Sequence, residues 1–110
     1  MNEISVEVRC ENVFADLGLG PTEAEELTAK SRLIIAMKDI IAQRKLTQKE
    51  AARVCGSDQP TLSKVLHGRM ESVTIDRLAS WLTALGRDIE IIVRPAPDIR
   101  HGRLQVINVA

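Results

Sequence analysis

The chain has 110 residues, 45% hydrophobic and 27% charged, which is typical of one globular domain and too short for two. Its formal net charge is zero, and Phe14 and Trp81 are the only aromatic residues, too few for a surface that stacks single-stranded bases. There is no apolar run near the ~20 residues of a membrane span and no secretory signal, so we expect a cytoplasmic protein with no membrane association, in which Cys10 and Cys55 are reduced.

The first predicted elements lie before residue 45. Apolar and polar residues alternate over residues 4–9, which indicates a short strand, and residues 12–17 can form one helical turn. Thr22 and Glu25 have the spacing of a capping box and begin a helix that we expect to end near Arg44. The apolar side chains expected on its buried face are Leu27, Leu33, Ile34, Met37, Ile40 and Ile41.

Two shorter helices follow, separated by a glycine. Thr47 and Glu50 form a second capping box, and Gly56 ends the helix that they begin. Asp58 caps the next helix, in whose first turn Pro60 loses no helical hydrogen bond. The apolar stripe of this helix and its final glycine are Leu62, Val65, Leu66 and Gly68.

A fourth helix and further strands are predicted in the last third. Ser72 or Thr74 caps the helix, and Gly86 ends it. Its apolar residues are Ile75, Leu78, Ala79, Leu82 and Leu85. Alternation then predicts strands over residues 88–94 and 104–109, which can pair within one chain or across the two-fold axis of a dimer.

These elements predict a mainly α fold. We expect a bundle of four to five helices that contains a helix-turn-helix, with short β-strands at the termini used in pairing or dimerisation. Residues 1–21 form an N-terminal strand and turn segment, residues 22–86 the helix-turn-helix domain, and residues 87–110 a C-terminal β segment and tail.

The neutral total hides an uneven distribution of charge. Residues 1–29 contain one basic and seven acidic residues, residues 30–70 contain nine basic and three acidic, and residues 71–110 contain five of each. A basic middle third points to an anionic partner for one surface. Solvated helix faces also carry lysine and arginine, so charge alone leaves both interpretations open.

The two short helices have the residue types that DNA recognition needs. Ala52 is small where the helices cross, Gly56 tolerates a left-handed backbone, and the apolar stripe leaves the other side of the second helix facing outward, as a helix in the major groove requires. Residues 47–68 resemble the Cro/repressor-type (XRE) helix-turn-helix. The residues that match its pattern are Gln48, Ala52, Gly56, Leu62, Val65 and Gly68. Through flanking residues 12–18 and 85–95, the chain also resembles the subgroup that includes HigA-type antitoxins.

The resemblance implies roles for individual side chains. The residues at base-reading positions are Gln59, Pro60, Thr61, Ser63 and Lys64, and those at DNA-backbone positions are Gln48, Lys49, His67 and Arg69. Glutamine suits adenine, and lysine suits guanine or a phosphate. Pro60 stands where many relatives carry a polar residue, so DNA shape is expected to contribute to specificity. Gln48 can instead serve only the capping box, and Arg69 can be a solvated charge.

The resulting hypothesis is a sequence-specific transcriptional repressor that binds a palindromic operator in double-stranded DNA as a homodimer. The antitoxin resemblance implies an autorepressor paired with a toxin protein, and the acidic residues 1–29 would complement a basic toxin. The alternatives are a phage-type repressor without a toxin, and a toxin neutraliser that binds DNA weakly. The spacing of the two cysteines and two histidines matches no zinc site, and the sequence shows no convincing set of a catalytic nucleophile with a general base. We therefore expect that the protein is not an enzyme and binds no metal or cofactor.

Overall fold

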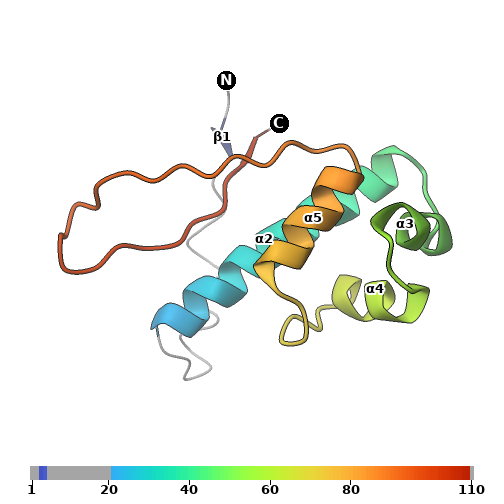
Figure 1. Cartoon of the computed structure of the whole chain (residues 1–110), viewed down its shortest axis with the longest axis horizontal. Coiled ribbons are helices and arrows are strands. Elements are labelled where there is room, and N and C mark those ends of the chain that lie inside the picture. The colour runs from blue at the N-terminus through green and yellow to red at the C-terminus, as the bar shows by residue number, and fades with distance from the viewer. Residues whose placement is uncertain (1–2, 5–20, 110) are drawn as a thin grey trace.

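The computed structural model describes residues 3–4 and 21–109, and within them the chain is mainly helical, as predicted. Figure 1 shows the arrangement of the elements. They are β1 (Glu3–Ile4), α2 (Pro21–Gln43), α3 (Gln48–Cys55), α4 (Gln59–Leu66), α5 (Ile75–Ala84) and β2 (Asn108–Val109). The helical turn predicted over residues 12–17, most of the strand predicted over residues 4–9, and Cys10 lie outside the described residues.

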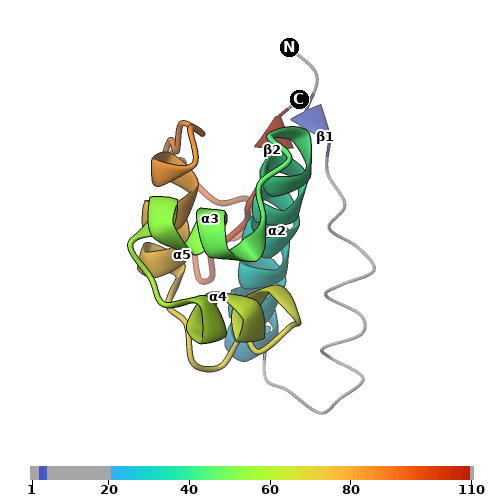
Figure 2. The ribbon, with the colours of Figure 1, turned by 90° about the vertical axis from the view of Figure 1, so that its right-hand side faces the viewer.

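The long helix α2 is the element on which the others pack. Helix α5 lies along it, α4 packs against α2, and α3 packs against α4 and α5 (Figures 1 and 2). Helix α2 begins at Pro21, one residue before the predicted start at Thr22, and the side chain of Thr22 lies outside the described part of the structure. The predicted end is confirmed within one residue, because Lys45 takes a left-handed conformation (φ 55°) and turns the chain toward α3.

The other predicted helix ends are confirmed. The Thr47 hydroxyl accepts from the Glu50 N–H at 3.1 Å, and the Glu50 carboxylate accepts from the Thr47 N–H at 3.0 Å, which completes the capping box of α3. Asp58 caps α4, and Thr74 caps α5. These bonds satisfy backbone donors that a helix start otherwise leaves unpaired.

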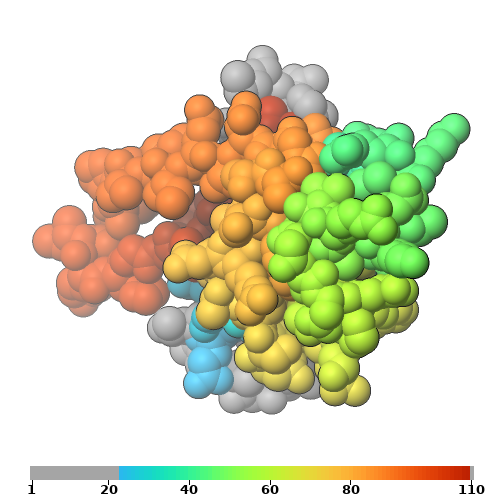
Figure 3. Space-filling view, turned by 45° about the vertical axis from the view of Figure 1, so that its right-hand side comes forward, coloured from blue at the N-terminus to red at the C-terminus, as the bar shows by residue number. Residues whose placement is uncertain are grey.

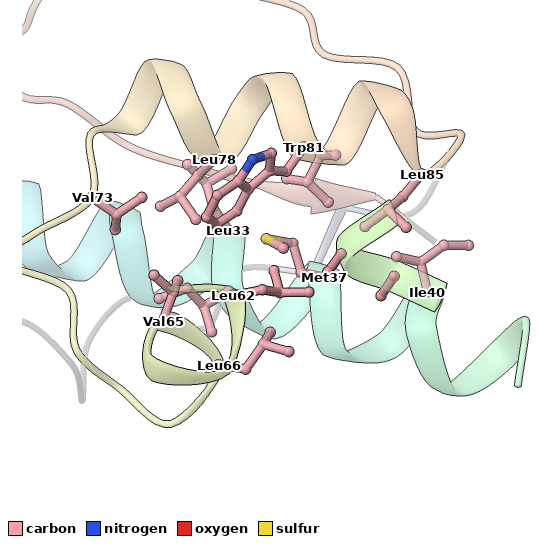
Figure 4. Close-up of a cluster of buried hydrophobic side chains, with 14 residues drawn as sticks. Leu33, Met37, Ile40, Leu62, Val65, Leu66, Val73, Leu78, Trp81 and Leu85 are labelled. Atoms are coloured by element: carbon pink, nitrogen blue, oxygen red, sulfur yellow. The ribbon is translucent and has the colours of Figure 1, made fainter. Parts of the chain in front are cut away.

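The core lies between α2, α4 and α5. In Figure 4, Leu62 and Leu66 of α4 point toward Met37 of α2, with Trp81 of α5 on the other side of that methionine. The members of α2 predicted to be buried are buried or half-buried, and Trp81 joins them in the core. Because the core takes one face of α4, its opposite face is free.

The structure corrects the predicted C-terminal strands. Residues 88–94 form no strand, and Ile91, Ile92 and Val93 are 88%, 72% and 91% exposed. Of residues 104–109, only Asn108–Val109 is a strand, paired antiparallel with Glu3–Ile4. A strand needs a neighbouring backbone to complete its hydrogen bonds, and alternation of residue types cannot supply one.

Near its C-terminus, the chain packs against α2 again. Arg32 of α2 is buried, and its Nη1 donates to the Val106 carbonyl at 2.7 Å, while the Asn108 side chain donates to the Arg32 carbonyl at 3.2 Å. The molecule measures 44 × 34 × 20 Å. In the described part of the chain, no helix is both long and apolar enough to span a bilayer.

Candidate nucleic-acid interface

Helices α3 and α4 are joined by a tight turn at Gly56. Its φ of 71° is left-handed, a conformation that glycine adopts without strain. After it, the Ser57 N–H donates to the Ala52 carbonyl at 2.9 Å, which closes the end of α3. Ala51 and Ala52 are buried, and their small side chains let α3 lie close to the core. The helix-turn-helix geometry predicted for residues 47–68 is present.

Helix α4 is buried on one side and open on the other. Leu62, Val65 and Leu66 enter the core. Among the five side chains predicted to read bases, Gln59, Pro60 and Lys64 are exposed, and Thr61 and Ser63 are half-buried. Figure 3 shows the atoms of α3 and α4, in green and yellow-green, on an uncovered face of the molecule.

The cap of α4 engages one of the predicted base-reading residues. The Thr61 hydroxyl donates to the Asp58 carboxylate, whose oxygens lie 2.8 and 2.9 Å away, and the Thr61 N–H donates to it at 3.0 Å. The side-chain bond, followed by the backbone bond, lowers the pKa of Asp58. With its proton held by Asp58, the hydroxyl has only acceptor lone pairs and a methyl group left for a ligand.

A shallow hollow of about 310 Å³ brings together polar groups from three parts of the chain. Gln48 at the start of α3 and His67 just after α4 line it together with Lys38 of α2. Its remaining lining is Ile41, Ala42 and Leu66. Sequence reasoning chose Gln48 and His67 and missed Lys38, because no local signal tells which side of α2 the start of α3 will meet.

The histidine of this hollow has a defined hydrogen bond. Its Nδ1 lies 2.7 Å from the Ser63 carbonyl oxygen. Since a carbonyl only accepts, Nδ1 carries the proton in this bond, and His67 can donate to a phosphate through Nε2 only as an imidazolium. Lys49 and Arg69, the other predicted DNA-backbone residues, are exposed.

The basic middle third divides into structural and surface charges. Lys30 is 7% exposed and donates to the Met70 carbonyl at 3.2 Å, with Glu26 at 3.6 Å, and Arg32 is 3% exposed. These two cations hold the fold together and do not form a binding surface. The basic residues of this third that are exposed are Lys38, Arg44, Lys45, Lys49, Arg53, Lys64 and Arg69.

Comparison with known proteins supports this geometry. A family model described as a helix-turn-helix domain matches residues 13–94. A solved structure provisionally named an XRE family transcriptional regulator is 34% identical, with a TM-score of 0.71, and the match covers 79% of this chain and 99% of that chain. A comparison with curated proteins gave no match.

Proposed function

Because this chain belongs to the XRE family of helix-turn-helix transcriptional regulators, we propose that it is a homodimeric repressor that reads a palindromic operator with α4. The observation that carries the proposal is the two-sided character of α4: Leu62 and Val65 are buried, whereas Gln59 and Lys64 on the same helix are exposed. A helix that packs against the core on one side and is exposed on the other can enter the major groove without any change in the core.

The base-reading roles follow from what each exposed group can donate or accept. Gln59, at the first turn of α4, suits the bidentate pattern of adenine, and Lys64 suits guanine or a nearby phosphate. Thr61 offers its methyl group and acceptor lone pairs, since its proton is bound to Asp58. Pro60 offers only its ring, and Ser63 a half-buried hydroxyl. Few hydrogen bonds then carry specificity, so DNA shape contributes.

The DNA-backbone roles centre on the hollow beside α4. Lys38 and Gln48 line it with N–H donors that can bind a phosphate group, and His67 can add a donor through Nε2 only as an imidazolium. Lys49, next to Gln48 in the chain, and Arg69, two residues after His67, are exposed and add positive charge to this part of the chain. Such contacts set affinity and register and carry no sequence information by themselves.

A homodimer is proposed because one helix of eight residues reads too few base pairs for specific binding. Two copies related by a two-fold axis double the contacts and match the symmetry of a palindrome.

The antitoxin role is proposed from the flanking sequence. Residues 1–29 contain seven acidic residues and one basic residue, which complements a basic partner enzyme. Co-expression with a small basic protein encoded by an adjacent gene tests this role. A complex of the two proteins that stays together through purification supports an antitoxin. A chain that shifts DNA and never retains such a partner is a phage-type repressor instead. A chain that retains the partner but binds DNA weakly is a toxin neutraliser.

The DNA-binding proposal is tested by operator titration. The operator is first identified among DNA fragments from the region upstream of the gene for this protein, as the fragment that the protein binds. Binding to that fragment is then measured by gel shift. Gln59→Ala and Lys64→Ala should each weaken binding by roughly 1–3 kcal/mol, about 5- to 150-fold, with unchanged helicity. Arg103→Ala, which removes an exposed cation outside helices α3 and α4, is the matched control. Unchanged affinity in both α4 variants would count against the proposed surface.

A further inference from the structure

The exposed apolar side chains of the described residues are concentrated in one segment. Nine large apolar residues are exposed, and seven of them lie between residues 89 and 109. Ile91, Ile92 and Val93 follow one another directly and are the largest continuous part of this surface. An extended run of exposed β-branched residues is a template for pairing with another strand.

This run belongs to a segment that is anchored at both ends. We call residues 88–103 the C-terminal arm. Before it, the Arg87 guanidinium donates to the Gln43 side chain at 2.9 Å, and Arg44 donates to the Leu85 carbonyl at 3.1 Å. After it, the Leu104 N–H donates to the Glu25 carboxylate at 3.4 Å, followed by the bond from Arg32 to Val106. These hydrogen bonds fix both ends of the arm to the helices, so the position of the arm relative to the helices is defined.

Residues 88–94, the first part of the C-terminal arm, have no hydrogen-bonded partner among the described residues. In Figure 1, the ribbon of residues 88–94 runs apart from the ribbon of the part of the arm that returns to the helices. Residues 88–94 make no hydrogen bond to the part of the chain that the structure describes. Their backbone donors and acceptors are thus available to a second strand.

The sequence of residues 88–94 is complementary to itself when reversed. With Ile91 opposite Ile91 of a second copy, Asp88 faces Arg94 and Ile89 faces Val93, and only Glu90 and Ile92 form an unlike pair. Opposite charges and β-branched pairs are the favourable cross-strand combinations. Pro95 lies just beyond this ladder, where its missing N–H costs nothing. Centring the pairing on Ile92 would set Glu90 opposite Arg94 instead, and Pro95 opposite Ile89 would shorten the ladder to residues 90–94.

We propose that residues 88–94 of two copies pair as antiparallel strands, with Ile91 on the two-fold axis. Charge favours a second copy over another protein, because the segment has an acid at its start and a base at its end, and its apolar face of Ile89, Ile91 and Val93 matches its own reverse. The proposal deepens the homodimeric repressor proposed above and rests on it for its purpose, since it names the surface that joins the two DNA-reading helices.

Disulfide trapping tests the register. In a chain with Cys10→Ser and Cys55→Ala, Ile91→Cys should form a covalent dimer under mild oxidation, because directly opposed strand residues are close enough for a disulfide. Ile99→Cys, at a residue 97% exposed elsewhere on the arm, is the matched control and should stay monomeric in a denaturing gel. Equal trapping at the control position, or trapping through Ile92→Cys and not Ile91→Cys, would overturn the proposed register.

Charge reversal tests the strand pairing by sedimentation equilibrium without DNA. Arg94→Asp should weaken the dimer by roughly tenfold, since it sets two like-charged pairs opposite each other, and the double variant Asp88→Arg with Arg94→Asp should restore it. A wild-type chain that is monomeric but still shifts operator DNA overturns the interface and leaves the DNA-binding function intact. A dimer with these charge effects that shifts no DNA supports the interface and contradicts the proposed function.

Discussion

Asp58 and Thr61 form a pair that both begins α4 and limits what the helix offers to DNA. The Asp58 carboxylate binds the N–H and the hydroxyl of Thr61, so the first turn is capped at the point that would enter the groove. A predicted base-reading residue is therefore also a structural residue. Replacing Thr61 would remove both its bond to the helix cap and any contact with a base. Substitutions of Gln59 and Lys64 therefore test base contact more directly.

The two caps of the helix-turn-helix predict an acid-sensitive stability. Bonds from the Thr47 backbone, then its side chain, lower the pKa of Glu50, and bonds from Thr61 lower that of Asp58. Since the folded-state pKa lies below the unfolded one, this stabilisation is complete above the ordinary carboxyl range, about pH 4, and is lost as pH falls through the lowered values. In thermal melts from pH 7 to pH 3, Glu50→Gln with Asp58→Asn, which keeps both caps, should lose less Tm than wild type. Equal losses would contradict the cap origin.

Lys38 is the residue that the tertiary structure adds to the proposed interface. Lys38→Ala should weaken binding to all operator variants by a similar factor and reduce the slope of log affinity against log salt by about one, because one phosphate contact is lost. Arg103→Ala serves again as the control, with an unchanged slope. A change in sequence preference with an unchanged slope would assign Lys38 a different role.

At the scale of elements, α4 depends on its apolar stripe for its position. Leu62 is completely buried against the core that α2 and α5 form. Leu62→Ala should lower the free energy of unfolding in urea by about 2–5 kcal/mol, through lost burial and the cavity left behind. Gln59→Ala, on the exposed side of the same helix, should change it by less than about 0.5 kcal/mol. Similar effects of the two variants would contradict the two-sided character of α4.

At the scale of the whole molecule, the C-terminal arm and α4 serve one purpose if the chain acts as a dimer. Ile91→Lys would place two like charges on the proposed axis. Its affinity for a full palindrome should fall to that for a half-site, while half-site binding stays unchanged because α4 is untouched. Titration of both DNA fragments measures this difference. An unchanged preference for the palindrome would show that the arm does not join the DNA-reading helices.

Local signals in the sequence account for most of the fold. Capping residues and Gly56 act within about four residues of the helix ends that they set, so Thr47, Asp58 and Gly56 could be recognised without knowing any distant contact. The spacing of Leu62 and Val65 likewise predicts which side of α4 is buried. The helix-turn-helix and its exposed side follow from these short-range effects.

The remaining features depend on residues that are distant in the chain. The hollow joins Lys38 with His67, and the buried Arg32 donates to the Val106 carbonyl, 74 residues further along the chain. The predicted strand over residues 88–94 is wrong for the single chain because a strand requires a hydrogen-bonded neighbour, which alternating residue types do not provide. Helices satisfy their backbone within a few residues, whereas strands and binding hollows are completed only by segments that folding, or a second molecule, brings alongside.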